Sequence, residues 1–122
     1  MIVKINPSKI SGAVYAPASK SSMQRACAAA LLTNGETILT NPGKWNDDVA
    51  ELDVIQSLGA TIKYLDDNKL LIKSKDYPSN SLATRGEGGV EVNCGESGLG
   101  LRMFAPIAAL SSNQIILNGT GS

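Results

Sequence analysis

The sequence predicts an α/β (α+β) fold of repeated β-α-β-α-β-β units, and its 122 residues hold about one and a half of them. Helix and strand signals follow this order once over residues 12–73, and part of the same order returns after residue 90. With 43% hydrophobic and 18% charged residues, the composition is that of a globular protein.

The first half of the unit starts with a short strand at residues 12–16, which Pro17 ends. A helix is predicted over residues 21–33, because serines can cap its start and Asn34-Gly35 can stop it. Apolar residues recur in it at spacings of three and four, so one face should be buried. A strand over residues 36–40 follows.

The second half of the unit starts at Asn46, which can cap another helix. Two acidic residues in its first turn suit the helix dipole, and Gly59 ends it. Residues 61–65 and 69–73 are predicted strands, joined as a hairpin by a cluster of turn residues.

A second copy appears when the chain is slid along itself by 77 residues, so that residues 21–41 fall on residues 98–118 without a gap. Arg25 then lands on Arg102, and the order of segment types is the same. This copy should hold a strand at 90–94, a helix at 98–110 and a strand at 114–117. Pro106 should bend the helix or break a turn near Ala105. Since the second unit is incomplete, we expect the chain to be part of a longer protein.

Charge and residue types exclude several classes of function. Eleven basic and eleven acidic residues cancel, so no overall field attracts nucleic acid or an anionic membrane. The sequence has no histidine, which excludes a Ser-His-Asp or Cys-His site within it. Cys27 and Cys94 form neither a disulfide framework nor a zinc site, so no metal is expected. No apolar run approaches the roughly 20 residues of a membrane span, and a reduced, cytoplasmic setting is the default expectation.

The first candidate site lies where the strand at 12–16 leads into the first helix. Lys20 supplies a compact positive charge, Ser21 a hydroxyl group, and Arg25 a planar cation one helical turn further on. Unpaired N–H groups at the helix N-terminus also favour an anion. The residues alone leave open a plainer interpretation, in which the serines only cap the helix and both cations stay in solvent.

The second candidate site occupies the matching place in the second copy, at residues 94–102. Its glycines allow a ligand to approach the backbone closely at Gly98, and Arg102 lies one turn into the next helix. An ordinary glycine-rich turn is the alternative. Because the two loops are equivalent in the repeat, we expect them to face one cleft. Asp47 and Asp48 fit a helix start, and a carboxylate that positions a cation is the alternative.

Taken together, the two loops resemble those of the 5-enolpyruvylshikimate-3-phosphate synthase family. Ala16-Pro17-Ala18-Ser19-Lys20-Ser21 with Arg25 resembles the family's P-x-S-K-S-x-x-x-R signature. Gly95-Glu96-Ser97-Gly98 with Arg102 is similar to its G-N-A-G-T-A-x-R loop, and Asn46-Asp47-Asp48-Val49 to its S-D-D-V helix start. The likeness spans nearly the whole chain.

This resemblance implies the enolpyruvyl transferase fold, with two domains of three units each and the active site in the cleft between them. Residues 1–11 would contain a strand that packs with the other, absent domain. Residues 12–74 would be the first unit, 75–89 a connector and 90–122 an incomplete second unit. The chain would then be the N-terminal part of the enzyme and would need the C-terminal part of the same protein as its partner.

The implied reaction transfers the enolpyruvyl group of phosphoenolpyruvate to the 5-hydroxyl of shikimate 3-phosphate and releases phosphate, in the shikimate pathway of aromatic amino acid biosynthesis. By motif position, Lys20 would contact both substrates, Ser21 and Arg25 would bind shikimate 3-phosphate, and the backbone at Gly98 would approach phosphoenolpyruvate. Arg102 also matches a motif position. The resemblance implies no cofactor or metal. It puts the proton-transferring groups downstream, so no catalytic residue is expected in this segment and the chain alone should be inactive.

Two departures and two alternatives remain. Glu96 stands where the family usually has Asn, and Leu99 where it has Thr; an acidic side chain there should weaken anion binding. One alternative is the related UDP-N-acetylglucosamine enolpyruvyl transferase, whose first loop has a Lys-Asn pair where this chain has Lys20-Ser21. The other is a non-catalytic anion-binding domain of the same fold.

Overall fold

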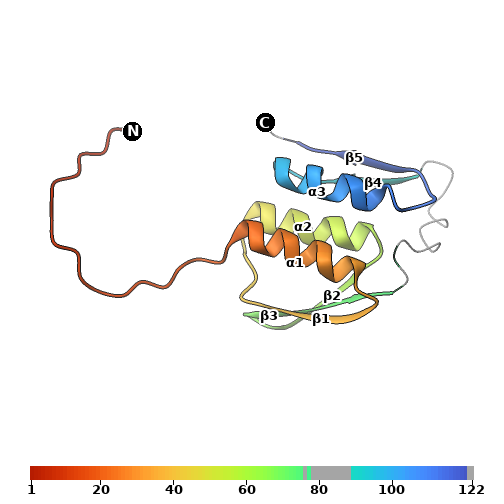
Figure 1. Cartoon of the computed structure of the whole chain (residues 1–122), viewed down its shortest axis with the longest axis horizontal. Coiled ribbons are helices and arrows are strands. Elements are labelled where there is room, and N and C mark those ends of the chain that lie inside the picture. The colour runs from red at the N-terminus through yellow and green to blue at the C-terminus, as the bar shows by residue number, and fades with distance from the viewer. Residues whose placement is uncertain (76, 78–88, 121–122) are drawn as a thin grey trace.

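The computed structural model describes residues 1–75, 77 and 89–120. The described part of the chain folds as three helices and five strands in mixed order (Figure 1). They are α1 (Lys20–Leu32), β1 (Gly35–Thr40), α2 (Asn46–Ser57), β2 (Thr61–Asp66), β3 (Lys69–Ser74), β4 (Val90–Asn93), α3 (Gly98–Ala108) and β5 (Ile115–Asn118).

The first unit contains a three-stranded antiparallel sheet in the order β1-β3-β2. In the pairing of β1 with β3, Leu39 lies opposite Leu70. In the pairing of β2 with β3, Ile62 lies opposite Ile72. The predicted hairpin is confirmed, and the Asn68 N–H donates to Asp66 Oδ1 at 2.8 Å in its turn. The central strand β3 therefore carries the side chains on which the helices pack.

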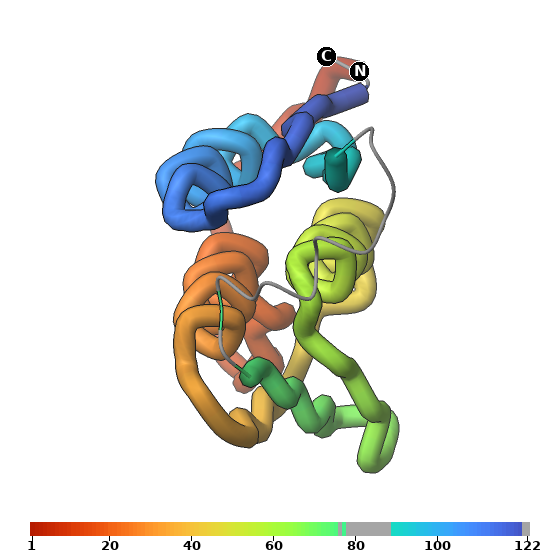
Figure 2. Tube along the Cα trace, turned by 90° about the vertical axis from the view of Figure 1, so that its right-hand side faces the viewer, coloured from red at the N-terminus to blue at the C-terminus, as the bar shows by residue number. Residues whose placement is uncertain are grey.

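The helices lie on one face of this sheet in a layered arrangement (Figure 2). α1 and α2 lie side by side over the sheet, and α3 with β4 and β5 forms a further layer above them. β4 and β5 pair in parallel and are connected through α3, which makes a β-α-β unit. All three helices run in the same direction, so their N-termini lie at the same end of the molecule (Figure 1).

A continuous core joins the layers. The buried faces of α1 and α2 meet β3 below and α3 and β4 above. Its largest fully buried apolar side chains are Leu31, Val54, Ile55, Leu58, Leu70, Ile72, Val92 and Phe104. Cys27 and Cys94 are free thiols and belong to this core. Because one core supports both α1 and α3, their relative position is fixed by packing.

Helices and strands from residue 20 onward agree with the sequence prediction. Each predicted helix or strand there appears within one or two residues of its expected ends. The predicted apolar face of α1 is buried, apart from the half-buried Ala26. On α2, Leu52, Ile55 and Leu58 are buried and Val49 is 47% exposed. The segment order of the internal repeat is present, since α1-β1 and α3-β5 follow each other in the same way.

One predicted strand is absent from the structure. Residues 12–16 form no strand: the segment extends away from the folded part with its side chains exposed, and without a neighbouring strand its backbone has no ladder to join (Figure 1). The first unit as described therefore starts at α1. Residues 2–5 are exposed as well, and Ile2 fully so. The strand expected within residues 1–11 was to pack with a domain outside this chain, so that expectation stays a prediction.

Pro106 lies inside α3. α3 continues through it to Ala108 without a broken turn and ends two residues earlier than predicted. Arg102, whose carbonyl would have accepted the missing N–H bond, is exposed, so water can satisfy that group. The predicted connector at 75–89 lies mostly outside the described residues.

Candidate functional site

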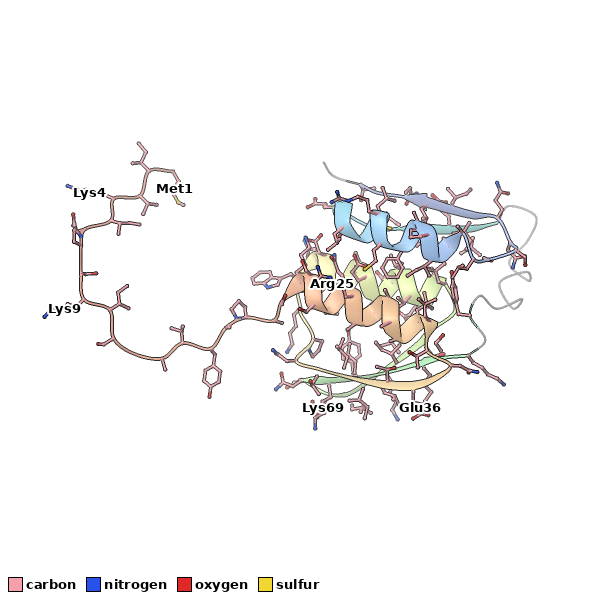
Figure 3. All side chains as sticks on the ribbon, viewed as in Figure 1. Met1, Lys4, Lys9, Arg25, Glu36 and Lys69 are labelled. Carbon is pink, nitrogen blue, oxygen red and sulfur yellow. The ribbon has the colours of Figure 1, made fainter. Side chains whose placement is uncertain are left out.

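The start of α1 carries three of the residues singled out from the sequence. Ser19 is the N-cap, and its Oγ accepts a hydrogen bond from the Ser22 N–H at 3.4 Å. Lys20 and Ser21 are the first two residues of the helix and are exposed, as is Arg25 one turn later (Figure 3). Ser19 therefore makes the helix cap, and no hydrogen bond of the Ser21 side chain occurs within the described residues.

Lys20 does not lie free in solvent, because it forms an ion pair with Asp47 in the first turn of α2. The hydrogen bond to Asp47 raises the pKa of Lys20, desolvation acts the other way, and the charges of Asp48 and Glu51 raise the pKa further. The ammonium group has three donors, so it can keep Asp47 and still donate to an anion. Asp47 is thus the carboxylate that positions a cation.

The start of α3 is built in the same way. Ser97 is its N-cap, and its Oγ accepts a hydrogen bond from the Gly100 N–H at 2.9 Å. Gly98 is the first helical residue, and an added Cβ there would meet nothing within 4 Å. The exposed Arg102 donates from Nε to the carbonyl of Gly98 at 2.9 Å. This bond holds the guanidinium beside the helix start.

The two loops come to the same end of the molecule, since α1 and α3 start there side by side (Figure 1). A buried hydrogen bond joins them directly: Gln24 Nε2 of α1 donates to Ser97 Oγ at 2.6 Å. Two helix N-termini, each with an arginine one turn on, therefore share one end of the fold. Such an arrangement suits a ligand with two anionic groups, or two anionic ligands.

A buried carboxyl lies beneath this end. Glu51 of α2 is fully buried, and its Oε1 accepts a hydrogen bond from Gln24 Nε2 at 2.8 Å. Burial raises the pKa of the Glu51 carboxyl to about 7, against the opposing effect of hydrogen bonds from Ser97 and Gln24. Near neutral pH this group thus exists in both protonation states.

Asp48 is the second buried carboxylate of α2. Its Oδ2 accepts a hydrogen bond from the Trp45 N–H at 3.1 Å, which closes the first turn of the helix. Gly43 packs against it so closely that an added Cβ would lie 2.0 Å from Asp48 Oδ2. Asp48 is therefore a helix-start residue, as the sequence indicated.

Sequence reasoning missed Gln24, Glu51 and Ser97. A signal for Glu51 was present, because Asp48, Glu51, Leu52 and Ile55 follow the spacing i, i+3, i+4, i+7 of one helix face. Gln24 has the same relation to Cys27, Ala28 and Leu31. A polar residue on an apolar stripe needs a buried partner, but the pattern does not say which.

In the described part of the chain, no cluster of three or more metal-ligating side chains occurs. Over the same residues, none of the helices has the length and apolar character that a membrane span requires. Glu96 and Leu99, the two departures from the family pattern, lie in the loop and the first turn of α3, and Glu96 is exposed.

Comparisons with known proteins agree with the motifs. The family model for EPSP synthase (3-phosphoshikimate 1-carboxyvinyltransferase) matches residues 5–122. The chain is 34% identical over 120 residues to the 3-phosphoshikimate 1-carboxyvinyltransferase of Clostridium perfringens, covering 98% of this chain and 27% of that protein. For the enzyme of the same name from Methanocorpusculum labreanum, the identity is 37% over 118 residues, with 97% and 26% covered.

A solved structure shares the fold. The EPSP synthase from Acinetobacter baumannii superposes with a TM-score of 0.65 at 19% identity, over 87% of this chain and 23% of that one. The chain thus spans about a quarter of the length of the relatives that it matches. The family match covers nearly every residue, and the chain belongs to the EPSP synthase family.

Proposed function

We propose that the chain supplies the N-terminal part of a 3-phosphoshikimate 1-carboxyvinyltransferase. The single observation that supports this is that the Gln24–Ser97 hydrogen bond holds the N-termini of α1 and α3 together, and helix N-termini favour anions. Both substrates of this reaction are anions, and their mutual repulsion has to be offset by fixed cations and N–H groups.

In the proposed reaction, the 5-hydroxyl oxygen of shikimate 3-phosphate forms a bond to the enolpyruvyl carbon, and the bond from that carbon to the phosphate oxygen breaks. Lys20 lies between the starts of α1 and α2 through its ion pair with Asp47, and we assign it to contact both substrates. Ser21 and Arg25 bind shikimate 3-phosphate. Gly98 and Arg102 serve phosphoenolpyruvate, because an open Gly98 leaves room for its anionic groups.

The remainder of the active site is proposed to lie outside this chain, which spans 27% of the Clostridium perfringens relative. Residues 90–122 are then the start of a second unit. The proton-transferring groups come from the rest of the protein, and the chain alone turns over no substrate. The complete enzyme acts in the cytoplasm, without a cofactor, nucleic acid or membrane as partner.

Phosphate release by the full-length protein tests this function. With phosphoenolpyruvate and shikimate 3-phosphate together, release should be fast, and with either substrate alone it should be absent. A parallel assay with UDP-N-acetylglucosamine as the acceptor tests for the activity of the related transferase. We do not expect this activity, because the related enzyme has Asn where this chain has Ser21. Release with UDP-N-acetylglucosamine only would assign the chain to the related enzyme. No release with any acceptor would favour a non-catalytic anion-binding domain.

A further inference from the structure

The buried hydrogen bonds beneath the two loops form a chain across three elements. Glu51 of α2 accepts from Gln24 Nε2 of α1 at 2.8 Å, and the same nitrogen donates to Ser97 Oγ, the cap of α3, at 2.6 Å. The bonds span 27 and 73 residues of sequence. All three side chains are at most 3% exposed, so water does not compete for them.

We propose that Glu51 is a positioning residue for the transfer reaction, which through Gln24 and Ser97 sets the start of α3 against the start of α1. The inference rests on the function proposed above, because it needs the two helix starts to bind the two substrates. Gln24 lies next to Arg25 in α1, and Ser97 next to Gly98. A shift in either buried side chain therefore moves a residue of the binding site.

The first turn of α3 packs closely against Glu51 and Ser97. Gly100 approaches Glu51 so nearly that an added Cβ would lie 2.2 Å from Glu51 Oε1 and 3.1 Å from Ser97 Oγ. The Gly100 N–H is also the donor that Ser97 caps, at 2.9 Å. A side chain at position 100 would force the buried Glu51 carboxyl to move, so the first turn of α3 lies directly on Glu51.

Two acceptor atoms in this cluster have no hydrogen-bond partner among the described residues, namely Glu51 Oε2 and Gln24 Oε1. An unpaired buried oxygen is costly, and most so when it carries charge. A proton on Glu51 removes the charge and gives the cluster a further donor. Burial outweighs the hydrogen bonds from Ser97 and Gln24, which favour the ionised form, so the protonated form is the more stable one in this cluster up to a pH of about 7.

Groups from every element packed against Glu51 affect this protonation. The charged or titratable ones are Asp47 and Asp48 on α2, Lys20 and Cys27 on α1, and Cys94 after β4. The acidic charge of Asp47 favours the protonated form, and Lys20 opposes it. Burial raises the pKa of the Cys27 thiol to about 12. Burial also raises the pKa of the Cys94 thiol, so both thiols stay neutral near pH 7. The cluster should then loosen as the pH rises through about 7, where Glu51 ionises.

The test uses three variants of the full-length protein. Glu51→Leu keeps a side chain of similar size but removes the acceptor oxygen. Proteins in which an apolar side chain replaces a buried charged group commonly still fold. Glu51→Gln keeps the acceptor oxygen and adds a donor that cannot ionise. Ser74→Ala is the matched control, because Ser74 is also buried and its hydroxyl donates to the Leu31 carbonyl, at the other end of α1.

For Glu51→Leu we expect the KM for phosphoenolpyruvate to rise about tenfold, the size of one lost hydrogen bond, with a smaller change in kcat. Glu51→Gln should keep KM within about twofold of the original protein and abolish the rise of KM with pH around neutrality. Ser74→Ala should leave KM unchanged. An unchanged KM in Glu51→Leu, or an equal rise in Ser74→Ala, would overturn the inference and leave the proposed function intact.

Hydrogen exchange of the Gly100 amide gives a readout that does not need activity. It should be at least about tenfold faster in Glu51→Leu than in Ser74→Ala, because only the first variant releases the cap. Equal exchange in the two variants would contradict the coupling. If the original protein released no phosphate but this difference appeared, the proposed function would fail while the coupling of α1 to α3 would stand.

Discussion

Gln24 and Ser97 are 73 residues apart in the sequence, yet Gln24 Nε2 donates to Ser97 Oγ at 2.6 Å in the core. Ser97 caps α3 and Gln24 precedes Arg25 in α1, so this bond fixes one candidate loop against the other. The internal repeat indicated that the loops are equivalent. The hydrogen bond shows how they are held at the same end of the fold.

Lys20 is predicted to matter most among the cations of this chain. In the full-length protein, Lys20→Ala should lower kcat/KM for enolpyruvyl transfer at least about 100-fold, because a fixed charge between two anions is lost. Lys73→Ala is the control, since Lys73 also pairs with an acidic residue, Glu36, but lies on the sheet. Steady-state kinetics would contradict the assignment of Lys20 if both variants kept near-normal kcat/KM.

The buried carboxyl of Glu51 makes the stability of the chain depend on pH. Its pKa is raised from 4.5 to about 7 in the folded state, so between these values the folded protein binds more protons than the unfolded one. The free energy of unfolding should therefore fall by about 3 kcal/mol as the pH rises from about 4.5 to about 7. Urea unfolding at several pH values measures this.

Glu51→Gln is the control for that pH dependence. Since glutamine does not titrate, the variant should lose most of the fall in unfolding free energy between pH 4.5 and 7. The same slope in both proteins would show that another group causes it.

Gly100 and Gly98 offer a matched pair for stability. Gly100→Ala puts a Cβ 2.2 Å from Glu51 Oε1 and should cost about 1–3 kcal/mol of unfolding free energy through overpacking. Gly98→Ala meets nothing within 4 Å and should be neutral or stabilising by up to about 1 kcal/mol, because alanine favours helix. Thermal or urea unfolding that gave equal losses would refute the close seating of α3 on Glu51.

Glu96 should weaken the binding of phosphoenolpyruvate, because no ion pair with Glu96 is formed within the described residues. In the full-length protein, Glu96→Asn should lower the KM for phosphoenolpyruvate by about two- to fivefold at low ionic strength, and less at high ionic strength, where charges are screened. Glu36→Gln removes an equally exposed charge from β1 and should leave KM unchanged. A higher KM in Glu96→Asn would mean that Glu96 assists binding.

Much of the fold could be predicted because short stretches of sequence are enough to mark where most helices and strands of this chain begin and end. The caps and stops of α1, the turn between β2 and β3 and the glycines before α3 mark the ends of these elements without reference to distant residues. The repeat then related residues 21–41 to residues 98–118. These signals were enough to identify Lys20, Ser21, Arg25, Gly98 and Arg102 as candidates.

The strand predicted at residues 12–16 failed for a physical reason. A strand is stable only beside another strand, and this requirement is not visible in five residues of sequence. At Pro106 the local chemistry predicted a disturbed helix, yet α3 continues through this residue to Ala108.

The buried cluster could not be predicted, since its bonds join residues far apart. The helical spacing places Glu51 and Gln24 on buried faces, but only the packing of α1, α2 and α3 makes them partners. The ion pair of Lys20 with Asp47 is a similar case. From the sequence, Asp47 could be a carboxylate that positions a cation, but the sequence did not indicate that the cation is Lys20.

The most direct test of the central claim is ³¹P NMR of the full-length protein with phosphoenolpyruvate and shikimate 3-phosphate. We expect the phosphoenolpyruvate signal to fall while the signals of inorganic phosphate and of a new phosphate ester rise in equal amounts. The 122-residue chain alone should leave the spectrum unchanged. Phosphoenolpyruvate that persists with a well-folded full-length protein, or phosphate that appears without the new ester, would contradict enolpyruvyl transfer.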